Sequence, residues 1–442
     1  AAVGAFTVAD SDDNGAATFS ATITVSQGTI SAVGGSGGTV SGTGTATVTL
    51  TGATEAQLNA RLQALTVTYP DEAGSPTGAD WNGNFTVTVV VNDGGSTGQR
   101  PGSLSGDSNN ATTNPGDFAY ADGSSAQLVT TRTISVTVTP VNDAPTRSDA
   151  TPVSLASVAE DSTGPAGSTV ASLFAAKFDD ARDGITGGSV PDSFAGIAIT
   201  TNNAVAAQGV WQYSPDGSTW TTLPAVSSTS ALLLQPTDQL RFVPAANFHG
   251  TPGGLVSRLV DSSGGALVTG STANVSNDSS LSGGSTRYSD SSNAITLTTI
   301  VSPVNDAPTV SDASLPAVNE DVTSAANGGA TVASLFGASY SDATDNRSSI
   351  PGGGNTSTAL AGIAILANST DPTTQGSWQY STSPGVWVNL PTGASLGTDG
   401  TAVILPTSAS LRFQPVDEPE ARAARRQARD ALHVQCLALR GR

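Results

Sequence analysis

The heptapeptide Pro-Val-Asn-Asp-Ala-Pro-Thr occurs twice in this chain, at residues 140–146 and again at residues 303–309. Each copy follows a run rich in Thr, Val and Ile, which is typical of β-strands, and each precedes a new stretch of similar sequence. Its two prolines stiffen the backbone and prevent the strand from continuing. The repeat therefore predicts a tandem array of β-rich modules in which the heptapeptide is the joint.

The joints divide the chain into module 1 (residues 1–146), module 2 (residues 147–309) and module 3 (residues 310–416). Module 2 is complete, module 3 repeats its opening, and module 1 is incomplete at its start and shares only the closing part. The matching segments of modules 2 and 3 are Val158–Asp161 with Val318–Asp321, Val170–Phe174 with Val332–Phe336, Ala195–Ile199 with Ala361–Ile365, Trp211–Ser214 with Trp378–Ser381, and Leu240–Pro244 with Leu411–Pro415.

Alternation of apolar and polar residues is the dominant pattern. Residues 18–25 and 84–91 both alternate, as half-buried strands of an antiparallel sheet do. Residues 57–65 are the exception, because Leu58, Leu62 and Leu65 recur at helical spacing and predict a short helix at one end of a sandwich. The predicted fold class is all-β, a string of antiparallel β-sandwiches.

After Pro415 the sequence of module 3 stops following that of module 2. Residues 417–442 form a basic tail rich in Arg, which includes His433 and Cys436 and has no counterpart in module 2. A shifted reading frame or a truncation explains this tail, and a genuine basic cap is the alternative. Without its last strands, module 3 is expected to leave sheet edges unpaired.

The 442-residue chain is acidic, since 36 Asp and Glu against 17 Lys and Arg give a net charge of −19. Such a charge repels nucleic acid and anionic membranes and favours cations as partners. The single cysteine excludes an intrachain disulfide framework, and no apolar run approaches the roughly 18 residues of a membrane span. The chain has no methionine and no leader, so we expect an internal piece of a longer protein.

Carboxylate and amide side chains gather in predicted loops beside both joints, at matching places in modules 2 and 3. Calcium takes roughly six to eight oxygen ligands, mostly carboxylates and carbonyls, so the pattern predicts calcium at the joints. The candidate ligands are Asn142, Asp143, Glu160, Asp161, Asp179, Asp180, Asp183 and Asp261 from the first joint onward, Asn305, Asp306, Glu320, Asp321, Asp342 and Asp345 from the second, and Asp10, Asp12 and Asp93 in module 1.

Asp and Asn also favour turns without any metal, so solvated turn residues are the alternative explanation. Recurrence at matching places favours calcium. Residues 10–15 match the first half of an EF-hand loop, but Ala21 stands where the bidentate Glu is required, so no EF-hand is expected.

Aromatic residues also recur, as a Trp-Gln-Tyr strand followed by a turn and a second Trp. Rings on one face of a hairpin either cover a small core or stack on sugars, and their recurrence favours packing. These residues are Trp211, Tyr213 and Trp220 in module 2 and Trp378, Tyr380 and Trp387 in module 3.

Signals for catalysis are weak. His249 lies in a loop of module 2 without a counterpart in module 3, and His433 lies in the tail. No His/Cys cluster is present that could hold zinc. A nucleophile-elbow pattern at residues 34–38 lacks its strand–turn–helix context. We therefore expect that the chain is not an enzyme.

The joint heptapeptide resembles the joints of cadherin-like tandem repeats in large secreted bacterial adhesins of the repeats-in-toxin class. The run from Trp211 through residues 240–244 to residues 247–250 resembles a repeat of the same giant exported proteins. Together the resemblances cover nearly everything up to Val416. They imply a rod of Ig/cadherin-like sandwiches, secretion from a Gram-negative cell by a type I system, and calcium that rigidifies the joints.

The resemblance also implies roles for single residues. The Asn-Asp pairs of the joints, residues 142–143 and 305–306, would be linker ligands, and Glu160 and Glu320 would resemble the cadherin glutamate near a domain's start. In the first joint Pro140 and Val141 replace an acidic lead-in and Ala144 replaces a second Asn, so fewer ligands come from the linker. The glycine-rich nonapeptide calcium repeats of type I substrates are absent from this stretch.

These observations predict an extracellular stalk segment of a bacterial surface adhesin, in cell adhesion or biofilm formation. Its partners would be calcium ions and neighbouring repeats of the same longer chain. The alternative is a module that binds host or matrix glycans, on the aromatic face or on the long Gly/Ser/Asn-rich loops. Buried rings would indicate packing, and exposed coplanar rings would indicate sugar binding.

Overall fold

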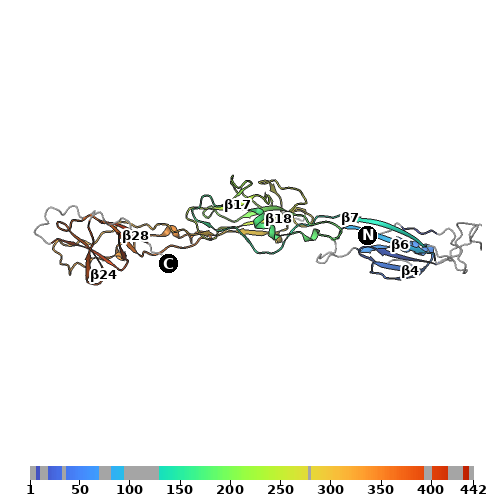
Figure 1. Cartoon of the computed structure of the whole chain (residues 1–442), viewed down its shortest axis with the longest axis horizontal. Coiled ribbons are helices and arrows are strands. Elements are labelled where there is room, and N and C mark those ends of the chain that lie inside the picture. Colours follow the sequence, from blue (N-terminus) through green and yellow to red (C-terminus); the bar gives the residue numbers. More distant parts are fainter. Residues whose placement is uncertain are drawn as a thin grey trace, which may run out of the picture.

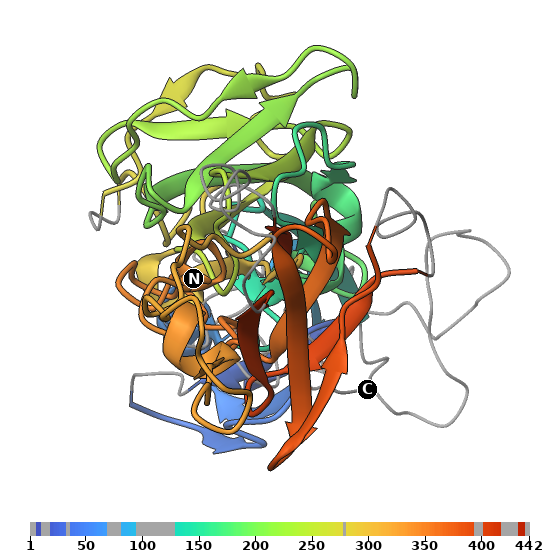
Figure 2. The same ribbon diagram turned by 90° about the vertical axis from the view of Figure 1, so that its left-hand side faces the viewer.

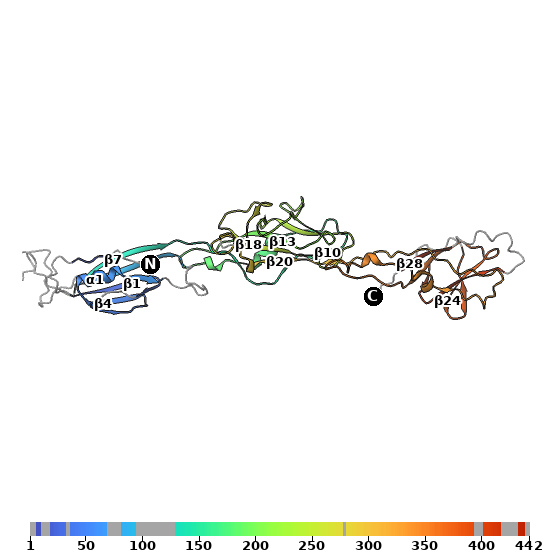
Figure 3. The same ribbon diagram turned by 180° about the vertical axis from the view of Figure 1, so that it is seen from behind.

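The computed structural model describes residues 6–9, 18–31, 36–68, 81–93, 129–276, 280–392, 401–416 and 432–437. In this part of the chain, three β-rich units follow one another along one long axis, module 1 in blue, module 2 in green and yellow and module 3 in orange and red (Figure 1). The view from behind shows the same order (Figure 3). The view along the axis shows the bulk of module 2 displaced to one side (Figure 2). Among the described residues no helix is long and apolar enough to cross a membrane.

Module 1 packs a five-stranded antiparallel sheet against a two-stranded one. The large sheet has the order β3 (Thr39–Ser41), β4 (Thr47–Ala53), β1 (Phe19–Val25), β6 (Gly83–Asn92) and β7 (Val129–Val138), and the small sheet pairs β2 (Thr29–Ser31) with β5 (Thr66–Thr68). Residues of β1 are alternately buried and more exposed, as predicted, because successive side chains point to opposite faces of a strand. The two strands predicted from alternation, β1 and β6, pair with each other.

The predicted helix is present as α1 (Glu55–Gln63), which begins and ends two residues before the predicted bounds. Thr54 and Gln57 form a capping box, in which each side chain bonds the backbone N–H of the other, so the helix begins at Glu55. Leu58, Leu62 and Leu65 are all fully buried in the core of module 1.

Module 2 is a sandwich of a six-stranded and a four-stranded sheet. The first has the order β19 (Thr272–Ala273), β16 (Ala231–Leu234), β13 (Phe194–Asn202), β18 (Leu255–Asp261), β20 (Ile295–Thr298) and β9 (Val153–Ser154), and the second has the order β11 (Ser168–Thr169), β17 (Gln239–Pro244), β14 (Gly209–Ser214) and β15 (Thr221–Thr222). The pairing is antiparallel except between β20 and β9. Ile197 and Leu259 of one sheet share a buried core with Trp211 and Phe242 of the other.

Short elements connect module 2 to its joints. They are β8 (Thr146–Arg147), which pairs with β12 (Phe178–Asp179), β10 (Val158–Ala159), which pairs in parallel with β21 (Val301–Ser302), the helix α2 (Val170–Phe174), and the 3-10 helices η1 (Ala175–Lys177), η2 (Ala181–Asp183) and η3 (Ser291–Asn293). The chain therefore enters module 2 beside β12 and leaves it beside β10.

Module 3 repeats this plan. One sheet has the order β22 (Ala330–Thr331), β27 (Ser410–Pro415), β24 (Gly376–Ser383) and β25 (Val386–Asn389), the other has the order β26 (Val403–Pro406), β23 (Gly362–Asn368) and β28 (Leu432–Leu437), and the helices are α3 (Val332–Phe336) and η4 (Ala343–Asp345). Helices α2 and α3 have the same sequence and the same Thr N-cap, Thr169 and Thr331. The sequence repeat is thus a structural repeat, and the predicted all-β fold of tandem antiparallel sandwiches in an extended rod is confirmed.

The expectation of unpaired edges in module 3 is wrong for β23. Strand β28, from the basic tail, pairs antiparallel along β23, with Ile363 opposite Cys436. In module 2 the same place beside β13 belongs to β18, with Ile197 opposite Leu259. Tail residues thus take the position of the missing closing strand. The remaining tail, residues 417–431 and 438–442, lies outside the described residues.

Candidate metal centres at the joints

Joint 1 (residues 140–146) is fastened to module 2 through Asp183. The backbone N–H of Asp143 donates to both carboxylate oxygens of Asp183, at 3.0 and 3.2 Å. The neighbouring Asn142 donates from Nδ2 to Asp261 Oδ2 at 3.4 Å and to the Thr286 carbonyl at 3.1 Å. The short helix η2 presents Asp183, and the end of β18 presents Asp261. Four residues named by the sequence pattern therefore meet at this joint.

Two further carboxylates, those of Asp180 and Asp192, complete the cluster. Asp180, Asp183 and Asp192 each offer an oxygen atom, and these three atoms lie within 4.8 Å of one another. Asp180 and Asp183 are each only 6% exposed. The backbone N–H of Asp192 donates to Asp180 Oδ2 at 2.6 Å. Asp192 was not predicted, and it is the functional candidate that sequence reasoning missed.

The electrostatics of joint 1 are unfavourable for its carboxylates. Burial raises the pKa of Asp180 to about 7, and the nearby carboxylates of Asp183, Asp261 and Asp192 raise it further against the opposing Asp192 N–H. Burial likewise raises the pKa of Asp183 to about 6, with contributions from Asp143, Asp192 and Asp261. Both shifts run opposite to those of paired carboxylates, so the surrounding protein does not neutralise this group.

Two buried oxygen atoms at joint 1 have no hydrogen-bond partner among the described residues, Asn142 Oδ1 and Asp180 Oδ1. A buried acceptor without a partner costs free energy unless another group satisfies it. Carboxylate and amide oxygens are the ligands that calcium prefers. The donor set, the charge and the two unsatisfied atoms of joint 1 all fit a hard cation.

Joint 2 (residues 303–309) repeats the linker contact. The N–H of Asp306 donates to Asp345 Oδ1 at 3.0 Å, as that of Asp143 does to Asp183. Burial raises the pKa of Asp306, and the carboxylates of Asp161 and Asp345 raise it further. Its Oδ2 atom is buried without a hydrogen-bond partner in the described part of the chain. Asp342 contributes a smaller repulsion from the start of η4.

Joint 2 differs from joint 1 at one position. Asp342 Oδ2 accepts from the N–H of Thr358 at 2.6 Å and from its hydroxyl at 2.9 Å. In module 2 the corresponding atom of Asp180 accepts from Asp192. Thr358 therefore takes the place of Asp192, and joint 2 has one carboxylate fewer there.

Two acids of module 2, Glu160 and Asp161, also lie at joint 2. Glu160 accepts from the backbone N–H of Val304 in the linker, and its Oε2 lies 3.2 Å from Nδ1 of His249. Both Glu160 and His249 are nearly fully buried. Asp161 accepts from the N–H of Asn247 at 2.7 Å, and its negative charge raises the pKa of Asp306. Carboxylates of two adjoining modules thus meet at joint 2.

Other predicted ligands lie elsewhere. Asp179 is exposed and accepts from the N–H of Ala181, as a turn residue does. Glu320 and Asp321 are exposed, next to Val322, whose carbonyl accepts from Gln414. Asp93 follows β6 at the end remote from joint 1, because the other end of that strand pairs with Val138. Asn305 is exposed and donates to the carbonyl of Asp306. Asp10 and Asp12 lie outside the described residues.

The modules also contact each other directly, through a loop of the following module. At joint 1 the side chain of Asn82 exchanges two hydrogen bonds with Ser189, at 2.7 and 2.8 Å. At joint 2 the N–H of Gly354 donates to the His249 carbonyl at 2.9 Å, and that of Thr251 donates to the Gly352 carbonyl at 2.8 Å. Each joint is therefore held by hydrogen bonds between the two modules as well as by the hydrogen bonds from the linker to a carboxylate.

A glycine makes each loop contact possible. Gly83 and Gly250 have positive φ angles of 124° and 122°. A Cβ atom would lie 2.9 Å from the Gly187 carbonyl at Gly83, and 2.1 Å from the Gly352 carbonyl at Gly250. Only glycine combines this backbone conformation with so close an approach.

The aromatic residues divide into buried and half-exposed rings. Trp211 is fully buried, packs edge-to-face on Phe242 at 5.2 Å, and donates from Nε1 to the Gly253 carbonyl. Its packing role is confirmed, and a stacking role for this ring in sugar binding is wrong because no face is accessible. Tyr213, Trp378 and Tyr380 are partly buried and pack against the cores.

The second tryptophans, Trp220 and Trp387, are also partly buried. The guanidinium carbon of Arg241 lies 4.0 Å from the ring centroid of Trp220, and that of Arg412 lies 4.0 Å from the centroid of Trp387. A guanidinium over an aromatic face is a favourable cation–π contact.

No family model matches the sequence, and no curated protein matches it. Among solved structures, protocadherin gammaB7 EC3-6 in a cis-dimer is similar at 15% identity and a TM-score of 0.33, over 90% of this chain and 62% of that one. Protocadherin gamma B2 extracellular cadherin domains 3–6 are similar at 13% identity and a TM-score of 0.30, over 90% of this chain and 68% of that one. Such TM-scores assign no function to this chain.

Proposed function

We propose that this chain is a structural segment of a secreted bacterial surface adhesin, a stalk whose joints are stiffened by calcium. The stalk would hold a distal binding domain away from the cell in adhesion or biofilm formation. The elongated order of three modules supports a spacer role (Figure 1). The bacterial origin, the extracellular location and type I secretion rest on the resemblance of the joint heptapeptide.

The carboxylate cluster of joint 1 is the observation that carries this proposal. Asp143 belongs to the linker, whereas Asp180, Asp183, Asp192 and Asp261 belong to the body of module 2. The raised pKa values of Asp180 and Asp183 indicate negative charge that the protein alone leaves uncompensated. A divalent cation would supply the compensating positive charge. It would bind between the linker and the body of module 2, and so would restrict the motion of one relative to the other.

The residues that would hold calcium follow from these contacts. At joint 1 they are Asn142, Asp143, Asp180, Asp183, Asp192 and Asp261, and at joint 2 they are Glu160, Asp161, Asp306, Asp342 and Asp345. When bound, calcium would neutralise the carboxylates and accept the free oxygen lone pairs. The linker amides of Asp143 and Asp306 already position the carboxylates, so the protein pre-organises each joint.

The loop contacts give the joints a second restraint. They join adjoining modules through Asn82 and Ser189 at joint 1 and through the backbone of residues 249–251 at joint 2, and no acidic side chain takes part in these hydrogen bonds. Carboxylate repulsion opposes these contacts in the metal-free protein. Calcium would remove this repulsion, so the bound metal and the loop contacts would both restrain the joint.

Calcium titration of a matched pair of variants tests the proposal. Asp183→Asn keeps an oxygen acceptor for the Asp143 N–H but removes one charge from the cluster, and we expect calcium affinity at joint 1 to fall by about tenfold or more. Asp179→Asn changes an exposed neighbour outside the cluster, and its affinity should equal that of the wild type. Isothermal titration calorimetry measures both.

Equal calcium affinity in the two variants would contradict the assignment of joint 1. An absence of any calcium heat in the wild-type chain at millimolar calcium would overturn the metal proposal as a whole. The acids would then be turn residues, and only the loop contacts would restrain the joints.

A further inference from the structure

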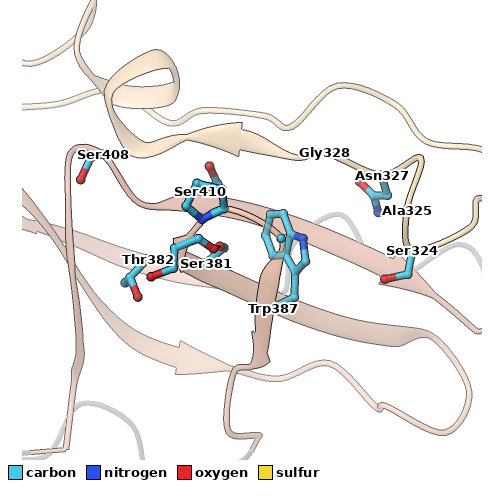
Figure 4. Close-up of a pocket in the computed structure, with 12 residues that line it drawn as sticks. Ser324, Ala325, Asn327, Gly328, Ser381, Thr382, Trp387, Ser408 and Ser410 are labelled. Atoms are coloured by element: carbon cyan, nitrogen blue, oxygen red, sulfur yellow. Dashed lines mark hydrogen bonds between the residues drawn. The ribbon is translucent and has the colours of Figure 1, made fainter.

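Module 3 contains a cavity of about 770 Å³, bounded by β24, β25, β27 and the segment that precedes β22 (Figure 4). This volume lies within the roughly 300–1,000 Å³ typical of small-ligand sites. None of the candidate calcium ligands lines it.

The lining has a distinct chemistry. Trp387 forms an aromatic wall, and hydroxyl and amide groups such as Ser324, Asn327, Ser381 and Ser410 surround it (Figure 4). The described residues that line the cavity include no Asp, Glu, Lys or Arg. A ligand that suits this lining is uncharged, carries many hydroxyls and has one apolar face.

Arg412 holds the parts of the cavity in place. This residue is 1% exposed, and its guanidinium lies over the Trp387 ring. Its Nη1 donates to the carbonyls of Ser324 and Asn327 at 2.6 and 2.7 Å, and its Nη2 donates to the Ser324 hydroxyl at 2.6 Å. One buried side chain therefore fixes both the aromatic wall and the polar wall, and such pre-organisation lowers the entropy cost of binding.

The equivalent place in module 2 is closed. There the ring of Trp220 is met by Gly167, where a Cβ atom would lie 2.3 Å from the ring atom Cη2. At Gly329, the counterpart in module 3, the atoms nearest to such a Cβ belong to Leu411 and Arg412 and not to the Trp387 ring, and at the neighbouring Gly328 a Cβ would meet nothing within 4 Å. Arg241, the counterpart of Arg412, reaches only the Pro165 carbonyl of this segment, at 3.4 Å.

A two-residue insertion accounts for the difference. Helix α2 starts 10 residues after the Glu-Asp glutamate of module 2 (170 − 160), whereas α3 starts 12 residues after that of module 3 (332 − 320). The longer segment contains Ser324 and Asn327, which bind Arg412. The insertion therefore supplies the polar wall and opens the space beside Trp387.

We propose that this cavity binds a neutral carbohydrate. The C–H groups on one face of a pyranose ring carry partial positive charge and would stack on Trp387, since an aromatic face is negative. Sugar hydroxyls both donate and accept, which matches the serine hydroxyls of the lining. A net charge of −19 and an uncharged lining disfavour acidic sugars. Arg412 is a positioning residue, because it acts through Trp387 and Ser324.

Binding of the full chain to immobilised oligosaccharides tests the site. The panel consists of neutral oligomers of glucose, galactose, mannose and N-acetylglucosamine, with sialyllactose as the acidic comparator. We expect at least one neutral oligomer to bind, in calcium and in chelator alike, because the cavity does not share the joint acids. Trp387→Ala should weaken that binding by about tenfold or more, Trp387→Phe should weaken it less, and Trp220→Ala, in module 2, should leave it unchanged.

Three results would overturn the site. They are no binding of any neutral oligomer at millimolar concentration, equal losses in Trp387→Ala and Trp220→Ala, and stronger binding of sialyllactose than of every neutral sugar. Persistence of sugar binding in chelator separates this site from the calcium proposal, so either can fail while the other stands.

Discussion

At the residue scale, the behaviour of joint 1 depends on two buried carboxylates. Asp180 and Asp183 are held close to each other and to Asp192 by backbone hydrogen bonds from Asp192 and from the linker residue Asp143. Like charges at such distances raise one another's pKa values. Protonation and cation binding each relieve this repulsion, so both should stabilise the folded joint.

The raised pKa values predict the pH dependence of the metal-free protein. Asp180 titrates near 7 when folded, whereas an unfolded Asp titrates near about 4. The folded state then binds more protons than the unfolded state, so the free energy of unfolding should fall as pH rises from about 4 to about 7. Melting temperatures of the metal-free chain at pH 5, 6, 7 and 8 measure this.

Two observations attribute the pH dependence to joint 1: the behaviour of other shifted carboxylates and that of an Asp180 variant. Asp149 and Asp216, whose hydrogen bonds hold their pKa values well below the usual range, do not titrate between pH 5 and 8. Asp180→Asn should flatten the profile. A metal-free melting temperature that rises with pH across this window, or a profile unchanged by Asp180→Asn, would contradict the assignment.

The sequence predicted most of the residues that meet at the joints, because recurrence in two modules marked them. The same criterion missed Asp192, since Thr358 replaces it in module 3. It also named Asp179, whose neighbour Asp180 turns into the cluster while Asp179 turns outward to cap a turn. Adjacent acids in a turn point in different directions, and spacing alone does not tell which one points inward.

At the scale of elements, the contact between modules 2 and 3 depends on a backbone that approaches another backbone. The segment from Arg347 to Gly354 lies against residues 247–251, and Arg347 Nε donates to the Asn247 carbonyl at 2.9 Å. Ile350 packs on the core of module 2. This contact requires the positive φ and the missing side chain of Gly250.

Replacing Gly250 by Ala should therefore break the contact. The added Cβ would meet the Gly352 carbonyl, and the residue would also be strained, with an expected cost of about 1–3 kcal/mol. Hydrogen exchange at the amides of Thr251 and Gly354, which donate across the contact, should become faster. Thermal melting reports the accompanying loss of stability.

Gly265→Ala is the matched control within module 2. Gly265 also has a positive φ, 76°, but a Cβ there meets nothing within 4 Å. This variant should show strain alone, with unchanged exchange at Thr251 and Gly354. Unchanged exchange in Gly250→Ala as well would show that the loop contact does not depend on this glycine.

Elements with a clear period were predictable, and elements without one were not. Strands β1 and β6 alternate and α1 has leucines at helical spacing, so their existence followed from side-chain periodicity. The loop of Arg347–Gly354 has no period, and its docking surface is mostly backbone. Strand β28 was missed because its sequence matches nothing in module 2. The repeat identified only its partner, β23.

At the scale of the whole molecule, two repeated joints were sufficient to predict a rod. The three modules do lie in sequence along one axis (Figure 1). The relative placement of the modules was not predictable, because it depends on loop contacts such as Asn82 with Ser189, whose partners are 107 residues apart in the chain. The net charge of −19 adds a long-range repulsion that favours an extended chain, and salt screens it.

The central claim is that calcium stiffens the joints of this rod. Small-angle X-ray scattering of the full chain, at constant ionic strength in chelator and in millimolar calcium, tests it most directly. We predict that calcium narrows the distribution of molecular dimensions towards that of a single extended rod, and that Asp183→Asn weakens the change while Asp179→Asn preserves it. Identical scattering with and without calcium, in a protein that binds the ion, would contradict the account.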